Sequence, residues 1–197
     1  ALNLASPRTK LPEQLLWSPE SPRLVDIQLR VLDGETELDA AASYTGLRTV
    51  GAEGGHVTIN GRPVYQLLVL EQAYWPETGF TAPSEQSLRA EAELIRDLGF
   101  NGLRMHQVTA DPRFLRICDE LGLLVWADLP AAYLFSDRAL ERTTANLHGL
   151  VARDRNHPSV IAWVPFNESW GLPDLPGALA QRNAVVSLHA LAKALDP

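Results

Sequence analysis

The sequence predicts an α/β fold, namely the first half of a (β/α)8 TIM barrel preceded by the last strands of a β-sandwich. Three observations lead to this prediction. From about residue 64, short apolar runs alternate four times with helical patterns. No Gly-rich phosphate turn follows the first of these runs. Polar and aromatic residues gather just after each run, where the active sites of barrels form.

The bulk composition is that of an ordinary globular protein. The chain has 197 residues, of which 46% are hydrophobic and 21% charged, enough to bury a sizeable core. It carries 17 basic and 24 acidic residues, a net charge of -7, with no Lys/Arg cluster. This balance argues against nucleic acid and against an anionic membrane surface as partners.

Cys118 is the single cysteine, so no internal disulfide can form, and a reducing compartment such as the cytoplasm is the simplest interpretation. Many secreted bacterial-type enzymes also lack disulfides. No run of about 18 apolar residues could span a membrane. The chain begins without Met or a signal-like segment and stops directly after a helical pattern, so we expect it to be a piece of a longer protein.

The first part of the chain is predicted to be β. Residues 25–31 alternate between apolar and polar, which is the period of a half-buried strand, and Asp33-Gly34 supplies a hairpin turn. Asn60-Gly61 between two short apolar runs predicts a second hairpin. The opening stretch is rich in proline and is expected to be loop. Its prolines are Pro7, Pro12, Pro19 and Pro22.

Four βα units are predicted after these hairpins. The strands are expected at about residues 65–70, 101–105, 123–126 and 160–164. Ser84, Asp111 (followed by Pro112) and Ser136 are expected to cap the first three helices. The fourth helix is expected over about residues 178–195. Consecutive βα units imply parallel strands with right-handed crossovers.

A doubly wound sheet and a half barrel both fit four such units, and the residues after the strands favour the half barrel. In a barrel the loops at the carboxyl ends of the strands face one mouth. The residues expected there are Glu71, Tyr74, Trp75, Arg104, His106, Asp128, Asn167, Glu168 and Trp170.

Asn167-Glu168 suggests glycosidic-bond cleavage. That reaction needs a carboxylic acid to protonate the leaving oxygen and a second carboxyl group on the other side of the sugar. The amide of Asn167 can bond a sugar hydroxyl, and the rings of Trp75, Trp163 and Trp170 offer flat apolar faces. For an isolated Asn-Glu pair a surface loop with a capping Asn would be the better interpretation, so the case for catalysis depends on the context of the pair.

Several motifs in order resemble glycoside hydrolase family 2, which contains β-galactosidases, β-glucuronidases and β-mannosidases. The matching stretches cover nearly the whole chain: Leu16 to Pro22, Thr45 to Arg48, Ile59 to Val64, Asn101 to Arg104, Cys118 to Val125, Arg153 to Ser159, Ile161 to Trp163 and Asn167-Glu168. The resemblance implies that residues 1–50 end an Ig-like β-sandwich domain. Residues 51–197 would then form the N-terminal half of a TIM-barrel catalytic domain.

The resemblance also implies a function: a retaining β-glycosidase, β-galactosidase-like, acting on β-linked carbohydrate without a cofactor. Glu168 takes the role of the general acid/base, and Asn167 would bind the sugar next to the cleaved bond. Arg104 would hold the floor of the site through carboxylate contacts, or form a structural ion pair. Glu71, Trp75 and Trp170 complete the expected substrate-binding residues.

The sequence departs from the family pattern at several of these positions. His106 lies two residues after Arg104, whereas many members have a histidine three residues after the arginine, so it is either a sugar ligand or a structural histidine. Asp128 stands where many members carry Asp-Glu and is either a sugar contact or a buried structural carboxylate. Leu129 to Ala132 lack the extra histidine of metal-binding members, so no metal is expected. His157-Pro158 is interpreted as a structural connector whose imidazole bonds backbone.

In the family the nucleophile is a second glutamate near the end of the seventh barrel strand, and no residue here matches it. We therefore expect this chain alone to have no turnover. A half barrel exposes strand edges, so self-association into a homo-oligomer is also expected. A non-catalytic carbohydrate-binding or scaffold module is the alternative function. An unrelated barrel isomerase or lyase is a third one, but neither a Lys base nor a set of metal carboxylates stands out.

Overall fold

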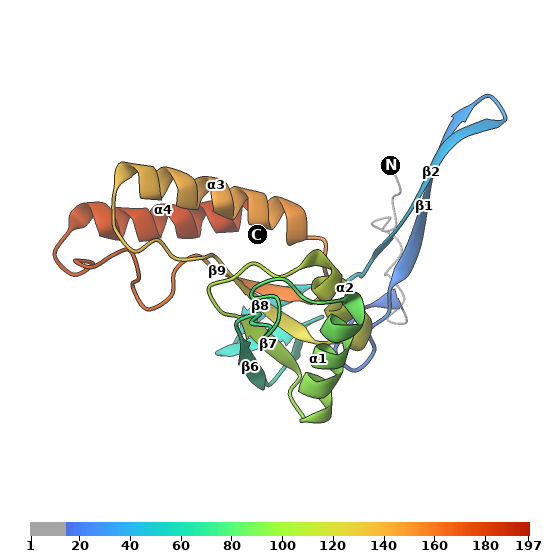
Figure 1. Ribbon diagram of the computed structural model, residues 1–197, viewed down its shortest axis with the longest axis horizontal. Helices are drawn as coiled ribbons and strands as arrows, with labels where there is room; N and C mark the ends of the chain where they lie inside the picture. Colours follow the sequence, from blue (N-terminus) through green and yellow to red (C-terminus); the bar gives the residue numbers. More distant parts are fainter. Residues whose placement is uncertain (1–14) are drawn as a thin grey trace.

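The computed structural model describes residues 15–197, which form three separate sheets (Figure 1). Two are small and antiparallel, and the third is a four-stranded sheet flanked by helices. Pro7 and Pro12 of the predicted proline-rich loop lie outside the described residues. Among the described residues, no helix has the length and apolarity needed to cross a membrane.

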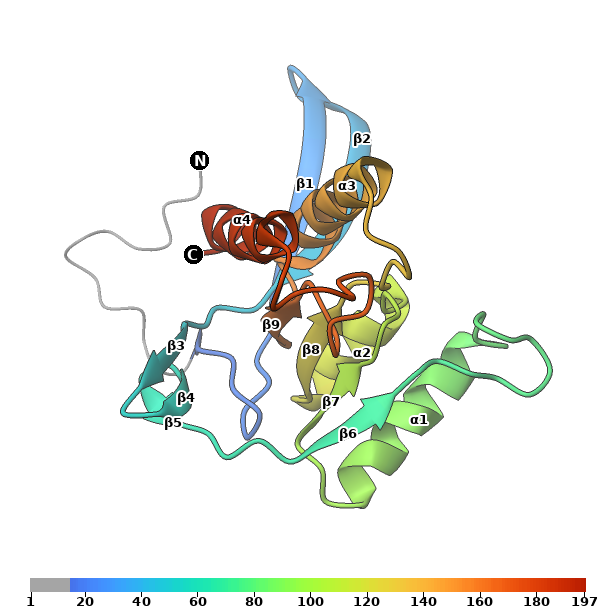
Figure 2. The same ribbon diagram turned by 90° about the vertical axis from the view of Figure 1, so that its left-hand side faces the viewer.

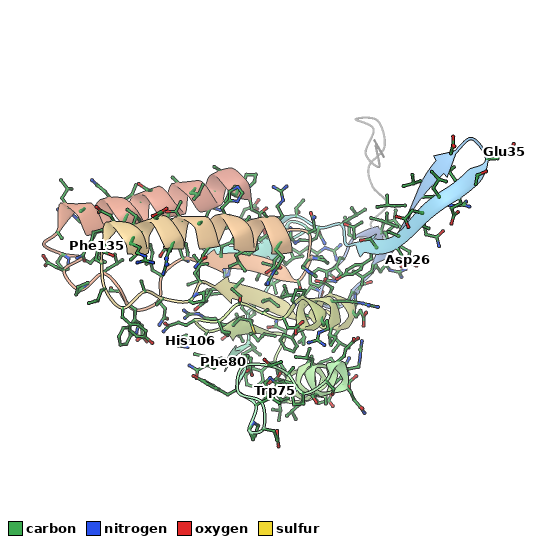
Figure 3. All side chains as sticks on the ribbon, turned by 45° about the horizontal axis from the view of Figure 1, so that its top comes forward. Asp26, Glu35, Trp75, Phe80, His106 and Phe135 are labelled. Atoms are coloured by element: carbon green, nitrogen blue, oxygen red, sulfur yellow. The ribbon has the colours of Figure 1, made fainter. Side chains whose placement is uncertain are left out.

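The first sheet is a long hairpin that projects from the rest of the molecule (Figures 1 and 3). It consists of β1 (Val25–Asp33) and β2 (Thr36–Thr45), and Gly34 in the predicted turn has φ +62°. The expected half-burial holds only at the start of β1, where Val25 and Ile27 are partly buried. It is wrong for Leu29 and Val31, which are 59% and 56% exposed. A two-stranded ribbon has no buried face of its own, and no second sheet among the described residues covers it.

The second sheet contains β3 (Val50–Glu53), β4 (His56–Ile59) and β5 (Arg62–Pro63). The predicted turn is confirmed, since Asn60 and Gly61 link β4 to β5 and both have positive φ, 54° and 73°. This is the conformation that makes Asn-Gly favourable in tight hairpins. Ile59 of this sheet packs with Trp17 and Leu124 in a small buried cluster.

The large sheet confirms the four predicted βα units. Its four strands are parallel and follow one another in chain order. The strands are β6 (Leu68–Glu71), β7 (Gly102–Met105), β8 (Leu124–Asp128) and β9 (Val160–Val164). The helices are α1 (Glu85–Asp97), α2 (Pro112–Leu121), α3 (Asp137–Asp154) and α4 (Leu179–Leu195). Parallel strands in this order, joined by helices, are the arrangement of half a barrel.

The predicted helix caps are also confirmed. The side chains of Ser84, Asp111 and Ser136 accept hydrogen bonds from backbone N–H groups in the first turns of α1, α2 and α3. The last helix differs, because Ala178 precedes α4 and provides no side-chain cap. Figures 1 and 2 show α3 and α4 lying side by side.

The two faces of the large sheet have different surroundings. One face packs against the helices, with Leu103, Met105 and Val125 in the main core. Because side chains alternate along a strand, Gly102, Arg104 and Leu124 point to the other face. A Cβ on Gly102 would lie 2.3 Å from the carbonyl oxygen of Leu124, so only glycine fits there. This second face corresponds to the interior of a barrel.

A buried carboxylate ties the projecting hairpin to the barrel strands. Asp119 of α2 accepts hydrogen bonds from Tyr44 Oη at 2.7 Å and from the backbone N–H of Ser159 at 3.0 Å. His157 Nδ1 lies 2.6 Å from the same carboxylate. His157 is thus in a structural network, although its imidazole bonds a carboxylate and not the backbone as expected. Burial, and then the charge of Asp119, raise the pKa of Tyr44, so its hydroxyl stays a donor.

Candidate active site at the carboxyl ends of the strands

A partly buried ion pair joins two neighbouring strands at the mouth of the half barrel. Arg104 of β7 donates from Nε to Asp128 Oδ1 at 3.0 Å and from Nη2 to Oδ2 at 2.8 Å. Asp128 ends β8 and is fully buried. This hydrogen bonding by Asp128 raises the pKa of Arg104. The fork of Arg104 therefore holds a fixed position.

Asn167, just after β9, completes this cluster. Its Oδ1 accepts a hydrogen bond of 2.7 Å from Arg104 Nη2. A guanidinium can only donate, so the amide oxygen must face Arg104 and the NH2 group must point elsewhere. That nitrogen is buried and has no hydrogen-bond partner within the described part of the chain. A buried donor without a partner costs free energy unless a ligand or water satisfies it.

Glu168 follows in a strained turn. Glu168 and Ser169 have φ of 49° and 63°, a left-handed conformation that is uncommon for residues other than glycine. The N–H of Trp170 closes the turn on the carbonyl of Asn167 at 2.9 Å. Glu168 directly follows Asn167 in the chain, and after the hydrogen bond and charge of Asp128 its charge also raises the pKa of Arg104. Within residues 15–197 no side chain pairs with this exposed carboxylate.

Two glutamines that the sequence did not single out belong to the same mouth. The backbone N–H of Gln107 donates to Asp128 Oδ2 at 3.2 Å, and Gln107 has φ +55°. The amide nitrogen of Gln72 lies 2.8 Å from His106 Nδ1. A backbone N–H leaves no trace in a sequence, so Gln107 could not have been found there. Gln72 could have been found from the sequence, because it lies two residues after Leu70 of β6 and so is expected on the same, inward face.

An aromatic pair forms the rim beside Glu168. The rings of Trp170 and Tyr133 meet edge to face with centroids 5.6 Å apart. Trp170 is 46% exposed and Tyr133 76%, so both present open ring surface. The loops that carry them are in contact, since a Cβ on Gly171 would lie 2.6 Å from the carbonyl oxygen of Ala132. Trp170 thus lies where it was predicted, and Tyr133 is its unpredicted partner.

Three of the residues named from the sequence lie away from this cluster. Glu71 and Trp75 line a pocket shared with α1 and α2, on the helix-covered face of the sheet. Figure 3 shows Trp75 beside α1 and His106 nearer the strand ends. Trp163 faces the helices too, where its Nε1 donates to Asp196 Oδ2 at 2.8 Å. The structure brings together Arg104, Asp128, Asn167 and Glu168.

The described residues contain no group of three or more His, Cys, Asp or Glu side chains placed to hold a metal ion. What the cluster offers is one exposed carboxylate, one unpartnered amide donor and an aromatic rim. A carboxylic acid beside hydroxyl-binding groups is the arrangement used in glycosidic-bond cleavage.

Comparison with known proteins identifies one family. Residues 50–197 match the family described as "Glycosyl hydrolases family 2, TIM barrel domain". A β-galactosidase of Thermoanaerobacter pseudethanolicus is 31% identical over 164 residues, which are 81% of this chain and 22% of that protein. β-Galactosidase 2 of Enterobacter cloacae is 32% identical over 78% of this chain and 16% of its own length.

The same similarity extends to solved structures. β-Glucuronidase 3 of Bacteroides uniformis superposes with a TM-score of 0.80 at 30% identity, over 92% of this chain and 24% of that one. The chain thus spans about a quarter or less of the length of these relatives.

Proposed function

Because the chain belongs to the family 2 glycosyl hydrolases, we propose that it is part of a retaining β-glycosidase whose general acid/base is Glu168. The observation that carries this proposal is the amide of Asn167, which is buried, held by Arg104 and left without a partner beside Glu168. A sugar hydroxyl next to the cleaved bond would accept this hydrogen bond. We further propose the division into a sandwich end (residues 1–50) and a barrel half (residues 51–197).

Glu168 would act twice in this mechanism. As an acid it protonates the glycosidic oxygen while a carboxylate on the opposite side forms a covalent glycosyl-enzyme. It then removes a proton from the water that hydrolyses this intermediate. The bond from Asn167 to the hydroxyl strengthens as charge develops on the sugar ring. Arg104 and Asp128 keep Asn167 in place, so their role is to orient it.

Asp128 is a poor candidate for the second carboxylate. It is fully buried, and both of its oxygens accept hydrogen bonds from Arg104. A nucleophile needs an oxygen free to attack the sugar. We therefore propose that the nucleophile lies outside residues 15–197, consistent with a chain that spans only 22% of its T. pseudethanolicus relative.

We propose a β-galactoside-like sugar as the substrate. Relatives are named both β-galactosidase and β-glucuronidase, so neutral and acidic sugars both have to be considered. The guanidinium at this site, that of Arg104, is already engaged by Asp128. A carboxylate on the sugar would need a cation of its own, so this pairing favours a neutral sugar.

The exposed rings of Trp170 and Tyr133 support a second candidate, a module that binds carbohydrate without cleaving it. Stacking on an aromatic rim requires no carboxylic acid. In this alternative, sugar binding would survive the substitution Glu168→Gln and be lost in Trp170→Ala.

Activity measurements test the leading proposal. The chain alone is expected to show no turnover of nitrophenyl β-glycosides, because the proposed nucleophile lies outside its described residues. A hybrid in which residues 50–197 replace the matching segment of the T. pseudethanolicus relative is expected to release nitrophenol from the β-galactoside. If the chain alone cleaves these glycosides and Glu168→Gln abolishes the cleavage, the proposal that the nucleophile lies elsewhere is wrong. A folded hybrid that cleaves no β-glycoside would contradict the proposed function.

Self-association is a further proposal, since β6 and β9 form the unpaired edges of the large sheet as described. Leu70 on the interior face is also 54% exposed. Open edges and exposed apolar residues promote pairing with another copy. We expect sedimentation velocity to show dimers or larger species whose share grows with concentration.

A matched pair of variants distinguishes association through the interior face from nonspecific association through any exposed leucine. Leu70→Lys is expected to raise the monomer fraction, because it places a charge on the interior face. Leu98→Lys changes a leucine that is 67% exposed after α1 and should have little effect. A wild-type chain that stays monomeric over the whole accessible concentration range would contradict this proposal.

A further inference from the structure

Two partly buried glutamates line a small pocket between β6 and α1. Glu71 comes from the end of β6 and Glu91 from the middle of α1, and both line a cavity of about 40 Å³. The surrounding side chains are mostly apolar, among them Trp75, Met105 and Phe114. A pocket of this kind solvates charge poorly, so two ionised carboxylates would strongly destabilise each other there.

The electrostatic surroundings favour one shared proton. Burial, and then the charge and hydrogen bond of Glu71, raise the pKa of Glu91 to about 8. The other ionisable groups facing Glu91 do not offset this. Asp111 at the start of α2 is a further carboxylate, already paired with Arg113, and the buried thiol of Cys118 also lies near. No Lys, Arg or His is among the described residues that line the pocket.

Glu71 also fixes the loop that follows β6. One of its carboxylate oxygens accepts a hydrogen bond from the backbone N–H of Ala73, and Ala73 has φ +54°. The backbone N–H of His106 donates to the carbonyl of Glu71 at 2.7 Å. Gln72 lies inside this turn, and its amide donates to His106 Nδ1 at 2.8 Å. A neutral His106 then carries its proton on Nε2, a donor suited to a hydroxyl.

We propose that Glu91 is a positioning residue of the candidate active site. By sharing a proton with Glu71, it locks the Glu71–Ala73 turn and thereby places Gln72 and His106 at the mouth to meet a sugar hydroxyl. The sugar as ligand rests on the proposed function, whereas the lock itself is a property of this chain. Once Glu91 ionises, repulsion between the two carboxylates releases the Glu71–Ala73 turn.

Nuclear magnetic resonance of the chain tests the lock without any activity assay, so its failure is distinct from failure of the proposed function. Carboxyl-carbon signals of labelled glutamates, the backbone amide of Ala73 and the side-chain amide of Gln72 are followed from pH 5 to pH 10. In the wild-type chain, the signals of the carboxyl pair, Ala73 and Gln72 are expected to move together, with one midpoint near pH 8.

Two variants decide the role of Glu91. In Glu91→Gln, which keeps a neutral hydrogen-bonding group, the Ala73 and Gln72 signals should stay at their low-pH positions throughout. Glu93→Gln, on the same helix, should retain the midpoint. Should Glu91→Gln fail to fold, Glu71→Gln removes the pair from the other side and should also abolish the midpoint. The absence of any glutamate midpoint between pH 5 and pH 10, or unchanged titration of Ala73 and Gln72 in the foldable variant, would overturn the proposal.

Discussion

Glu168→Gln is expected to lower the turnover of a nitrophenyl β-galactoside by the hybrid enzyme by roughly 10²–10⁴-fold, the usual contribution of a positioned acid or base. Gln keeps the size of the side chain and can still donate a hydrogen bond, but it cannot transfer a proton. Nitrophenolate leaves readily without protonation. The loss should therefore fall mainly on the second step, in which a water attacks the glycosyl-enzyme and needs a base.

The measurement separates the two steps. A fast burst of nitrophenol followed by slow steady turnover is expected for Glu168→Gln, because the intermediate accumulates. In Glu168→Ala, azide should restore turnover, since this anion needs no base, and the product should be the β-configured glycosyl azide. Glu141→Gln, an exposed glutamate on α3, serves as the control and should leave turnover unchanged. Unaltered turnover in Glu168→Gln would remove Glu168 from the chemistry.

The βα framework could be predicted because its signals are local. A serine or aspartate at the start of a helix satisfies N–H groups only two or three residues away. Asn60-Gly61 adopts the positive φ that a tight hairpin needs wherever it occurs. These features require no knowledge of distant parts of the chain. The burial of β1, by contrast, depends on whether another element packs on it. The alternation of apolar and polar residues does not reveal this.

The orientation of Trp163 shows why a site is harder to predict than a fold. Val125 pairs with Val160, but Trp126 pairs with Ala162, so β9 contains one extra residue at this point. An uninterrupted register would have placed Trp163 opposite Asp128. The irregularity moves Trp163 opposite Ala127, toward the helices. A shift of one residue in the pairing moves each following side chain to the opposite face of the sheet. Nothing in the sequence indicates this bulge.

Glu71 illustrates the opposite case, in which closer use of the sequence would have helped. A residue just past a strand was expected at the mouth because it follows the strand. Alternation from Leu70, which shares a face with Arg104, places Glu71 on the helix-facing side and Gln72 on the inner side. Its partner Glu91 lies on a helix 20 positions away in sequence, and only the packed structure brings the two together.

Asp119→Ala is expected to destabilise the chain by about 3–5 kcal/mol, which lowers Tm by roughly 6–20 °C for a domain of this size. Asp119 is fully buried and accepts bonds from Tyr44 and from the backbone of Ser159, with His157 also in contact. Removing the acceptor leaves the buried N–H of Ser159 unpaired and takes the carboxylate partner from the partly buried Tyr44 and His157. Thermal unfolding followed by circular dichroism measures the loss. Asp97→Ala, at an exposed helix end, should change Tm little.

Tyr44→Phe then tests whether the projecting hairpin is energetically part of the barrel. Tyr44 belongs to β2, and Asp119 belongs to α2, so their hydrogen bond crosses between the two regions. The single substitution should cost about 1 kcal/mol. In the Asp119→Ala background it should cost less, because only the 3.2 Å contact of the hydroxyl with His157 Nδ1 remains. Full additivity of the two losses would mean that Tyr44 acts through some other contact. In that case the hydrogen bond to Asp119 would not be what couples the hairpin to the barrel.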